Sequence, residues 1–124
     1  MRTVLVVDDD EQLRGVVKLI LSDSGYAVLE AANGREVGAL YDQHHPDLVI
    51  TDLLMPDKEG LEVIMDLNRS DHHARIIAMS GGGRINAESY LLLANKLGVR
   101  RTLTKPFTPD QLLEAVRLEL GSEV

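Results

Sequence analysis

Five short apolar segments alternate along this chain with longer segments of helical periodicity, and this alternation limits the possible folds more than any other feature. The apolar segments are continuous, which is typical of parallel strands that are covered on both faces. Strands are expected at 4–7, 27–29, 48–51, 76–79 and 102–104. Because crossovers between parallel strands are right-handed, the sequence predicts an α/β fold, a doubly wound five-stranded parallel sheet with helices on both faces.

The segments between the strands carry the start signals and apolar faces of helices. Asp10 is expected to cap the first helix, whose apolar positions are Leu13, Val16, Val17, Ile20 and Leu21. Asn33 and Glu36 have the spacing of a capping box, which predicts that a second helix begins there. Two further helices are expected at 59–68 and 87–97. The last helix follows a second capping box, and its inner face is expected to consist of Leu112, Leu113, Val116 and Leu120.

Size, charge and composition exclude several kinds of function. The chain has 124 residues, the length of one domain, so a single domain over 1–124 is expected. Its formal net charge of −7 opposes binding to nucleic acid backbones, and the absence of cysteine excludes disulfides, thiolate metal sites and thiol catalysis. No apolar segment is long enough for a signal peptide or a membrane span, so we expect a cytoplasmic protein with no membrane partner.

Polar side chains follow the expected strands at one edge of the sheet. Asp8 and Asp9 come directly after the first strand, and the later strands are followed by Asp52, Ser80 and Lys105. Ligands of open α/β sheets bind beyond the carboxyl ends of the strands. Taken singly, each residue has a common structural explanation as a cap, a turn residue or a solvated charge. Together they bring three carboxylates, a hydroxyl and an ammonium to one place.

This combination of groups is suited to metal-assisted phosphoryl transfer. Clustered carboxylates raise one another's pKa, which destabilises the fold unless a cation is present. Mg²⁺ is the suitable cation, because it is a hard ion that prefers oxygen ligands. In such a site the metal and the ammonium neutralise charge on the transferring oxygens, and a carboxylate is the nucleophile.

Four motifs resemble, in chain order, those of the receiver domain of two-component response regulators. They are Val7-Asp8-Asp9-Asp10, Leu48-Val49-Ile50-Thr51-Asp52-Leu53-Leu54-Met55-Pro56, Met79-Ser80-Gly81 and Leu103-Thr104-Lys105-Pro106-Phe107. The resemblance covers essentially the whole chain, which is similar to a single-domain, chemotaxis-regulator-like receiver. It implies a flavodoxin-like (βα)5 fold, and phosphoryl transfer to an aspartate from a sensor histidine kinase or a histidine phosphotransfer protein.

The resemblance also implies the roles of the acidic residues. Asp52 matches the phosphoacceptor of the family. Asp8 and Asp9 match the acidic pair that holds Mg²⁺, with Asp52 and the backbone carbonyl of Leu54 as further ligands. A receiver of this kind is a signalling domain that catalyses only its own phosphorylation and dephosphorylation, rather than an enzyme acting on other substrates.

The remaining motif residues match the part of the family that responds to phosphorylation. Ser80 matches the hydroxyl that turns toward the phosphoryl group, and Lys105 matches an invariant lysine whose bond to Pro106 is typically cis in the family. Thr102 stands where the family often has Tyr or Phe, so it cannot act as an aromatic switch. We therefore expect the response to be concentrated at Ser80 and in the loop 81–84, which begins at Gly81, and in the helix that follows.

One helix offers a candidate surface for partners. The inner stripe of the helix 87–97 consists of Tyr90, Leu93, Ala94 and Leu97. At about 100° per residue, Leu92 points nearly opposite this stripe and Leu91 lies on its flank. In receivers the matching face, formed by this helix, the fifth strand and the last helix, often docks a downstream target or a second receiver.

Three alternatives fit parts of the same pattern. A flavodoxin-like nucleotide-binding domain could use the loop 80–84 as a phosphate cradle, but the Asp-rich first loop repels phosphate and only four aromatic residues are present. A degenerate receiver binds partners without phosphorylation, yet it usually lacks an acidic residue or the lysine. A haloacid-dehalogenase-type phosphatase would use Asp8 as nucleophile with Asp10 two residues later, but the chain lacks the usual cap and length.

Overall fold

The computed structural model describes residues 2–53, 60–70, 74–81, 92 and 94–121. These residues form one five-stranded sheet in the order β2-β1-β3-β4-β5, and every neighbouring pair of strands is parallel. The strands are β1 (Thr3–Val7), β2 (Ala27–Ala31), β3 (Leu48–Asp52), β4 (Ile76–Gly81) and β5 (Arg101–Lys105). The predicted doubly wound parallel sheet is confirmed, and each strand lies within two residues of its expected bounds.

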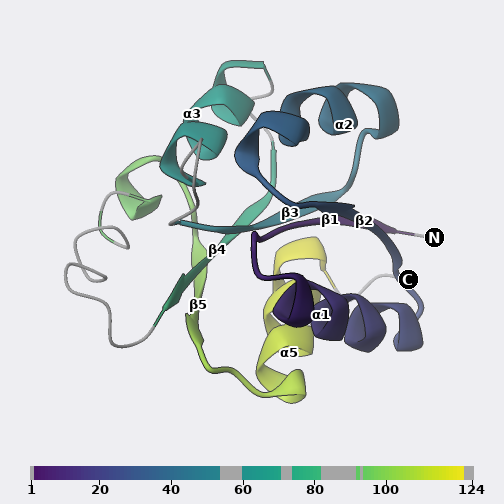
Figure 1. The fold of residues 1–124 in the computed structure, drawn as a ribbon. Coiled ribbons are helices and arrows are strands. Elements are labelled where there is room, and N and C mark those ends of the chain that lie inside the picture. Colours follow the sequence, from purple (N-terminus) through teal and green to yellow (C-terminus); the bar gives the residue numbers. More distant parts are fainter. Residues whose placement is uncertain (1, 54–59, 71–73, 82–91, 93, 122–124) are drawn as a thin grey trace.

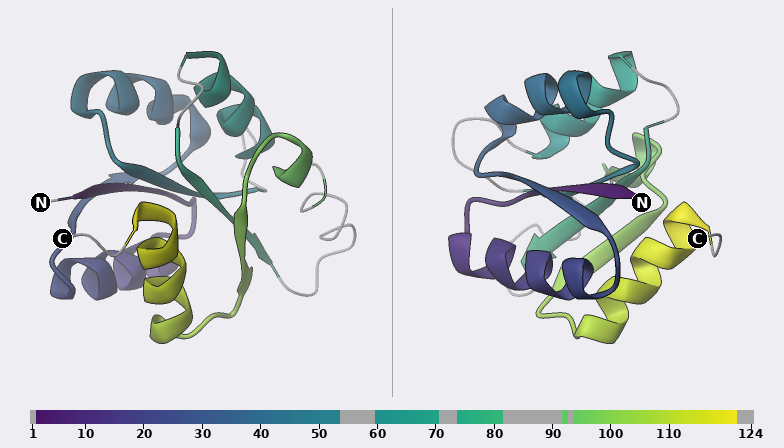
Figure 2. Two further views of the ribbon diagram at one scale, coloured as in Figure 1. Left: turned by 180° about the vertical axis from the view of Figure 1, so that it is seen from behind. Right: turned by 90° about the vertical axis from the view of Figure 1, so that its right-hand side faces the viewer.

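Helices cover both faces of this sheet (Figures 1 and 2). One face carries α2 (Val37–His44) and α3 (Gly60–Ser70), and the opposite face carries α1 (Glu11–Asp23) and α5 (Pro109–Leu120). Leu92 and residues 94–96 are also helical. In the described residues, no helix has the length and apolar character needed to cross a membrane.

Two hydrophobic layers form because successive residues of a strand point to opposite faces. On β1, Leu5 and Val7 belong to the layer beneath α2 and α3, and Val4 and Val6 belong to the layer beneath α1 and α5. All four of these side chains are fully buried. Ala94 is buried in the first layer, which agrees with its expected place on an inner helix stripe.

The local start signals of α1 and α5 act as the sequence indicates. The Asp10 side chain accepts a hydrogen bond from the amide of Leu13 at 3.1 Å. Thr108 and Gln111 form the expected reciprocal capping box, with bonds of 2.8 and 3.1 Å. Each signal spans only three residues, so it operates before any tertiary contact is made.

The start of α2 differs from the expected capping box. Asn33 accepts from the amide of Arg35 at 2.9 Å, and Glu36 accepts from the amide of Ala32 at 2.8 Å rather than from Asn33. The segment Gly34–Glu36 forms a 3₁₀ turn, and α2 begins only at Val37.

Two helix faces are also narrower than expected. Val16 was expected on the inner stripe of α1, but it is 51% exposed, and only Val17 and Leu21 of that stripe are fully buried. On α5, Leu113 is partly buried, and Ala115 takes a buried position instead. In both cases a helix at the surface contacts the sheet through one narrow strip, so an apolar residue beside that strip stays in contact with water.

Candidate functional site

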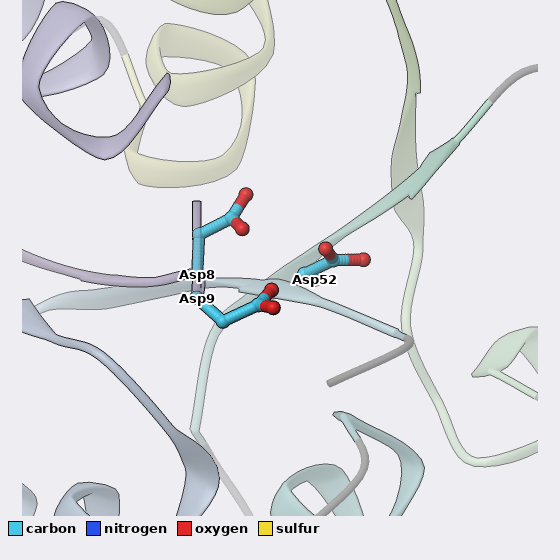
Figure 3. A group of neighbouring side chains, drawn as sticks. All are labelled: Asp8, Asp9 and Asp52. Carbon is cyan, nitrogen blue, oxygen red and sulfur yellow. The ribbon is translucent and has the colours of Figure 1, made fainter. Parts of the chain in front are cut away.

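The carboxyl ends of the strands bring the predicted charged residues together. Asp8 and Asp9 directly follow β1, Asp52 ends β3 and Lys105 ends β5. Figure 3 shows the side chains of Asp8, Asp9 and Asp52 near one another, with their carboxylates projecting toward the same side. One carboxylate oxygen of each lies within 4.8 Å of the others, with Asp8 and Asp52 buried and Asp9 exposed.

Lys105 joins this cluster from the edge strand. Its Nζ lies 2.9 Å from Oδ2 of Asp8 and 3.0 Å from Oδ2 of Asp52, so one ammonium bridges two buried carboxylates. β5 is two strands away from β3, a separation of about 10 Å, which a long side chain is needed to cross. The Lys105–Pro106 peptide bond is cis, as the family resemblance implied.

Burial and the contacts between opposite charges shift the pKa values of Asp8 and Lys105 in opposite directions. Burial raises the pKa of the Asp8 carboxyl above its ordinary value of 3.8, although hydrogen bonds from the Asp10 amide and from Lys105 favour the charged form. Burial alone would lower the pKa of Lys105, but its hydrogen bonds to Asp8 and Asp52 outweigh this effect and raise it. Lys105 therefore stays charged at neutral pH.

The donor set fits a hard divalent cation. Three carboxylate oxygens converge within 4.8 Å, two from buried residues and one from a residue open to solvent. Mg²⁺ prefers such oxygen ligands and keeps several of its waters, for which the exposed side of Asp9 leaves room. Leu54, whose carbonyl was expected to complete the set, lies outside the described residues.

Ser80 lies near the end of β4 and is buried, and its Oγ has no hydrogen-bond partner in the part of the chain that the structure describes. A buried hydroxyl without a partner costs free energy, so it is usually kept for a ligand or a water. Ser80 pairs in register with Thr104, the neighbour of Lys105. This register places the Ser80 hydroxyl at the same carboxyl-end edge of the sheet as the Lys105 ammonium.

The other predicted switch and surface residues are only partly described. Gly81 ends β4 opposite Lys105, and Thr102 is exposed on β5 opposite Ala78. Leu92 is 64% exposed, which agrees with the expectation that it points away from the inner stripe. Leu91 and the loop residues 82–84 lie outside the described residues.

Sequence reasoning missed one residue that holds the backbone of the first acidic loop. Arg14, one turn into α1, donates from Nη1 to the carbonyl of Asp8 at 2.8 Å. Its Nε donates to Oε1 of Glu30 at 3.0 Å, and Nζ of Lys18 lies 3.3 Å from Oε2 of the same carboxylate. The available signal in the sequence was the pair of basic residues Arg14 and Lys18, four residues apart on one helix, together with the acidic Glu30 on the next strand.

A second missed residue is Gly60, the first residue of α3. A β-carbon at this position would overlap the carbonyl oxygen of Asp52 and approach Cα of Leu53 to 2.7 Å. The Gly60 amide donates to the carbonyl of Leu53 at 3.0 Å, and the Leu53 amide donates to Met79 at 3.0 Å. The backbone after Asp52 is therefore held on both sides by neighbouring elements.

Comparison with known proteins agrees with this arrangement. A family model described as the response regulator receiver domain matches residues 4–117. The chemotaxis protein CheY of Bacillus subtilis is 36% identical over 119 residues, which are 95% of this chain and 97% of that protein. The sporulation initiation phosphotransferase F of the same organism is 28% identical over 114 residues, which are 92% of this chain and 90% of that protein.

Solved structures give the same result for the fold. The chemotaxis protein CheY4 of Vibrio cholerae is 30% identical with a TM-score of 0.87, covering 97% of this chain and 99% of its own. A receiver domain protein from Clostridium thermocellum is 27% identical with a TM-score of 0.88, covering 97% of this chain and 94% of its own.

Proposed function

This chain belongs to the family of response regulator receiver domains, which are signalling domains phosphorylated on an aspartate, and from this premise we propose that residues 1–124 form one phosphoacceptor domain whose acceptor is Asp52. The observation that carries the assignment is the bridge made by Lys105. Its ammonium contacts Asp8 and Asp52 at the sheet edge where Asp9 supplies a third carboxylate. The position of Asp52 at the end of a central strand, beside both other acids, favours it as the nucleophile.

The donor is the phosphohistidine of a sensor histidine kinase or of a histidine phosphotransfer protein. A carboxylate oxygen of Asp52 attacks the phosphorus, and an O–P bond forms as the N–P bond breaks. The electron pair of the broken bond stays on the imidazole nitrogen, and the product is an aspartyl phosphate. Lys105 is already within hydrogen-bond distance of Asp52, so its ammonium stabilises the negative charge of the phosphoryl oxygens without a large rearrangement.

Asp8, Asp9 and Asp52 are the residues that would hold Mg²⁺, together with the carbonyl of Leu54. When bound, the ion would neutralise charge on the phosphoryl oxygens. The buried Asp8 is fixed by the Asp10 amide at 2.9 Å and by Lys105, so its carboxylate is oriented before any ligand arrives. Receiver domains bind Mg²⁺ at an acidic cluster, which is the kind of cluster found here.

The signal leaves the site through β4. The Ser80 hydroxyl donates a hydrogen bond to a phosphoryl oxygen, and Gly81 and the loop after it follow the displacement. Because Thr102 is small, this loop and the segment 87–97, which the sequence predicts to be a helix with Leu91 and Leu92 on its outer side, transmit the change to a docking face that also includes β5 and α5. That face binds a downstream protein target or a second copy of this chain.

Mass measurement of the intact protein tests the acceptor assignment. Incubation with acetyl phosphate and Mg²⁺ is expected to add one phosphoryl group to the parent and none to Asp52→Asn. Asp23→Asn, which removes an exposed carboxylate from the far end of α1, is the matched control and is expected to react like the parent. Phosphorylation that persists in Asp52→Asn, or a parent that takes up no phosphoryl group, contradicts the proposal.

A further inference from the structure

Arg14 connects the first acidic loop to the neighbouring strand through two of its nitrogens. Nη1 donates to the Asp8 carbonyl at 2.8 Å, and Nε donates to Glu30 Oε1 at 3.0 Å. The Arg14 side chain is 14% exposed; its bond to the Asp8 carbonyl is partly buried, and its bond to Glu30 lies at the surface. The Glu30 contact also lowers the pKa of that carboxyl, because hydrogen bonding from Arg14 favours its charged form.

The bond from Arg14 fixes the peptide group that leads from Asp8 into Asp9. The other polar groups of Asp8 are held as well, since its amide donates to Ala31 at 3.1 Å and its carboxylate accepts from the Asp10 amide and from Lys105. The carbonyl of Asp8 belongs to the same peptide plane as the amide of Asp9. The orientation of this plane sets the direction in which the exposed Asp9 side chain leaves the backbone.

From these contacts we propose that Arg14, supported by Glu30, is a positioning residue that keeps Asp9 in the acidic cluster and thereby sets its affinity for Mg²⁺. Arg14 donates to a backbone carbonyl and to a glutamate outside the cluster, so it acts on the metal ligands only through the backbone. Groups that hold metal ligands in this indirect way typically change metal affinity by 10- to 100-fold when they are removed. The part that concerns Mg²⁺ rests on the proposed function.

The arrangement of its donors, rather than its charge, explains why an arginine is suited to position 14. The planar guanidinium presents several donors in a fixed arrangement, so a single side chain reaches both the Asp8 carbonyl and Glu30. A lysine at this position keeps the positive charge but offers one compact ammonium in place of a rigid fork. Arg14→Lys therefore separates a role in positioning from a role in local electrostatics.

Binding of Mg²⁺ alone, measured by titration calorimetry, is the first test. We expect Arg14→Met to weaken Mg²⁺ binding by about 10-fold or more, and Arg14→Lys to weaken it nearly as much. Glu30→Gln is expected to show a smaller loss, and its effect is expected to be largely absent in the Arg14→Met background, because both residues act through one chain of contacts. Lys18→Met is the matched control, since Lys18 pairs with Glu30 from the opposite oxygen, and it is expected to bind Mg²⁺ like the parent.

A second test needs no metal. In EDTA, amide exchange measured by NMR is expected to be at least several-fold faster at Asp10 in Arg14→Met than in the parent, because the loop that carries its acceptor has lost its anchor. The amide of Leu53, which is bonded to β4, is expected to exchange at the parent rate. If Arg14→Met does not fold, Arg14→Lys and Glu30→Gln carry both tests.

The outcomes separate this inference from the proposed function. A parent that binds no Mg²⁺ overturns the proposed metal site, and the role given to Arg14 with it. If the parent binds and the Arg14 variants bind equally well, with unchanged exchange at Asp10, only the positioning role is overturned. An Arg14→Lys variant that matches the parent in both tests would overturn the argument from geometry, because charge alone would then be sufficient.

Discussion

Lys105 places one ammonium between two buried carboxylates, and Asp9 brings a third carboxylate into the same cluster. Like charges at this distance repel, and in the buried part of the site the repulsion is only weakly screened. Burial of Asp8 adds a desolvation cost, which is why its pKa is raised in spite of its contact with Lys105. The residues that suit the site to a cation therefore destabilise it when no cation is bound.

Charge substitutions in EDTA are expected to change stability in opposite directions. Asp52→Asn removes the charge that repels Asp8 and Asp9 and also ends the ion pair with Lys105. We expect the lost repulsion to outweigh the lost pair, so that the free energy of unfolding rises by up to about 1 kcal/mol. Lys105→Ala leaves Asp8 buried without its counter-charge and is expected to lower the free energy of unfolding by about 3 kcal/mol. Lys18→Ala is the control and is expected to change little, because Lys18 pairs at the surface. Urea unfolding measures all three, and a less stable Asp52→Asn would contradict this electrostatic account.

The contact of Glu30 with Arg14 predicts a pH dependence of known sign. Its folded-state pKa lies below the ordinary value of 4.5, so its stabilising effect is present above that value and is lost as the pH falls through the folded-state pKa. At pH 7 the free energy of unfolding of the parent is expected to exceed that of Glu30→Gln by less than about 1 kcal/mol, since the Arg14–Glu30 pair is partly exposed. Unfolding at a series of pH values is expected to show this difference shrinking in acid. A difference that grows instead would contradict the direction of the shift.

At the scale of secondary structure, the site depends on how closely α3 approaches the end of β3. The Leu53 peptide accepts from the Gly60 amide and donates to Met79, so the backbone after the proposed acceptor is held between a helix and a strand. Only a residue without a side chain allows this approach. Gly60 is thus required by packing, since it is not among the described glycines that have a positive φ.

Gly60→Ala is expected to lower the free energy of unfolding by about 1–3 kcal/mol, because the added β-carbon forces α3 away from Asp52. Gly38→Ala is the matched control. Gly38 lies inside α2 with open space around its Cα, so alanine there is expected to stabilise by about 0.5–1 kcal/mol. Urea unfolding of both variants tests the comparison. Equal stabilities for the two would show that the close approach of α3 has no energetic consequence.

Substitutions on the outer and inner sides of the segment around Leu92 are expected to have different effects, on partner binding and on stability respectively. Leu92 is 64% exposed, so Leu92→Ser is expected to change the free energy of unfolding by less than about 0.5 kcal/mol while weakening target binding or self-association. Leu97 packs against the core layer, so Leu97→Ser is expected to cost about 2 kcal/mol or more. Thermal melts compare the two variants. A Leu92→Ser variant as unstable as Leu97→Ser would place Leu92 in the core.

What could be predicted from sequence depended on the range of the interactions involved. Asp10 and the capping box of α5 rest on bonds across three residues, and these predictions are confirmed. The displaced start of α2 was missed, because the choice of Glu36 between two nearby amides does not follow from spacing. Arg14 and Gly60 were missed for a different reason. Their partners lie on other elements, and no single-segment pattern shows which side chain or backbone will meet them.

At the scale of the whole molecule, strand order explains why residues far apart in the sequence form one cluster. β1 and β3 are neighbours at the centre of the sheet, so Asp8, Asp9 and Asp52 emerge side by side. Their meeting could be predicted, because parallel strands must present their carboxyl ends at one edge. The bridge from Lys105 to both buried acids could not, because it depends on the path of a long side chain across the end of β4.

Chemical trapping of the phosphorylated residue tests the central claim most directly. Borohydride reduces an aspartyl phosphate to homoserine, which peptide mass spectrometry then locates in the chain. After incubation with acetyl phosphate and Mg²⁺, we predict homoserine at position 52, with Asp8 and Asp9 unmodified. Homoserine at Asp8, the nucleophile expected of a dehalogenase-type phosphatase, would contradict the assignment of this site as the phosphoacceptor of a receiver domain.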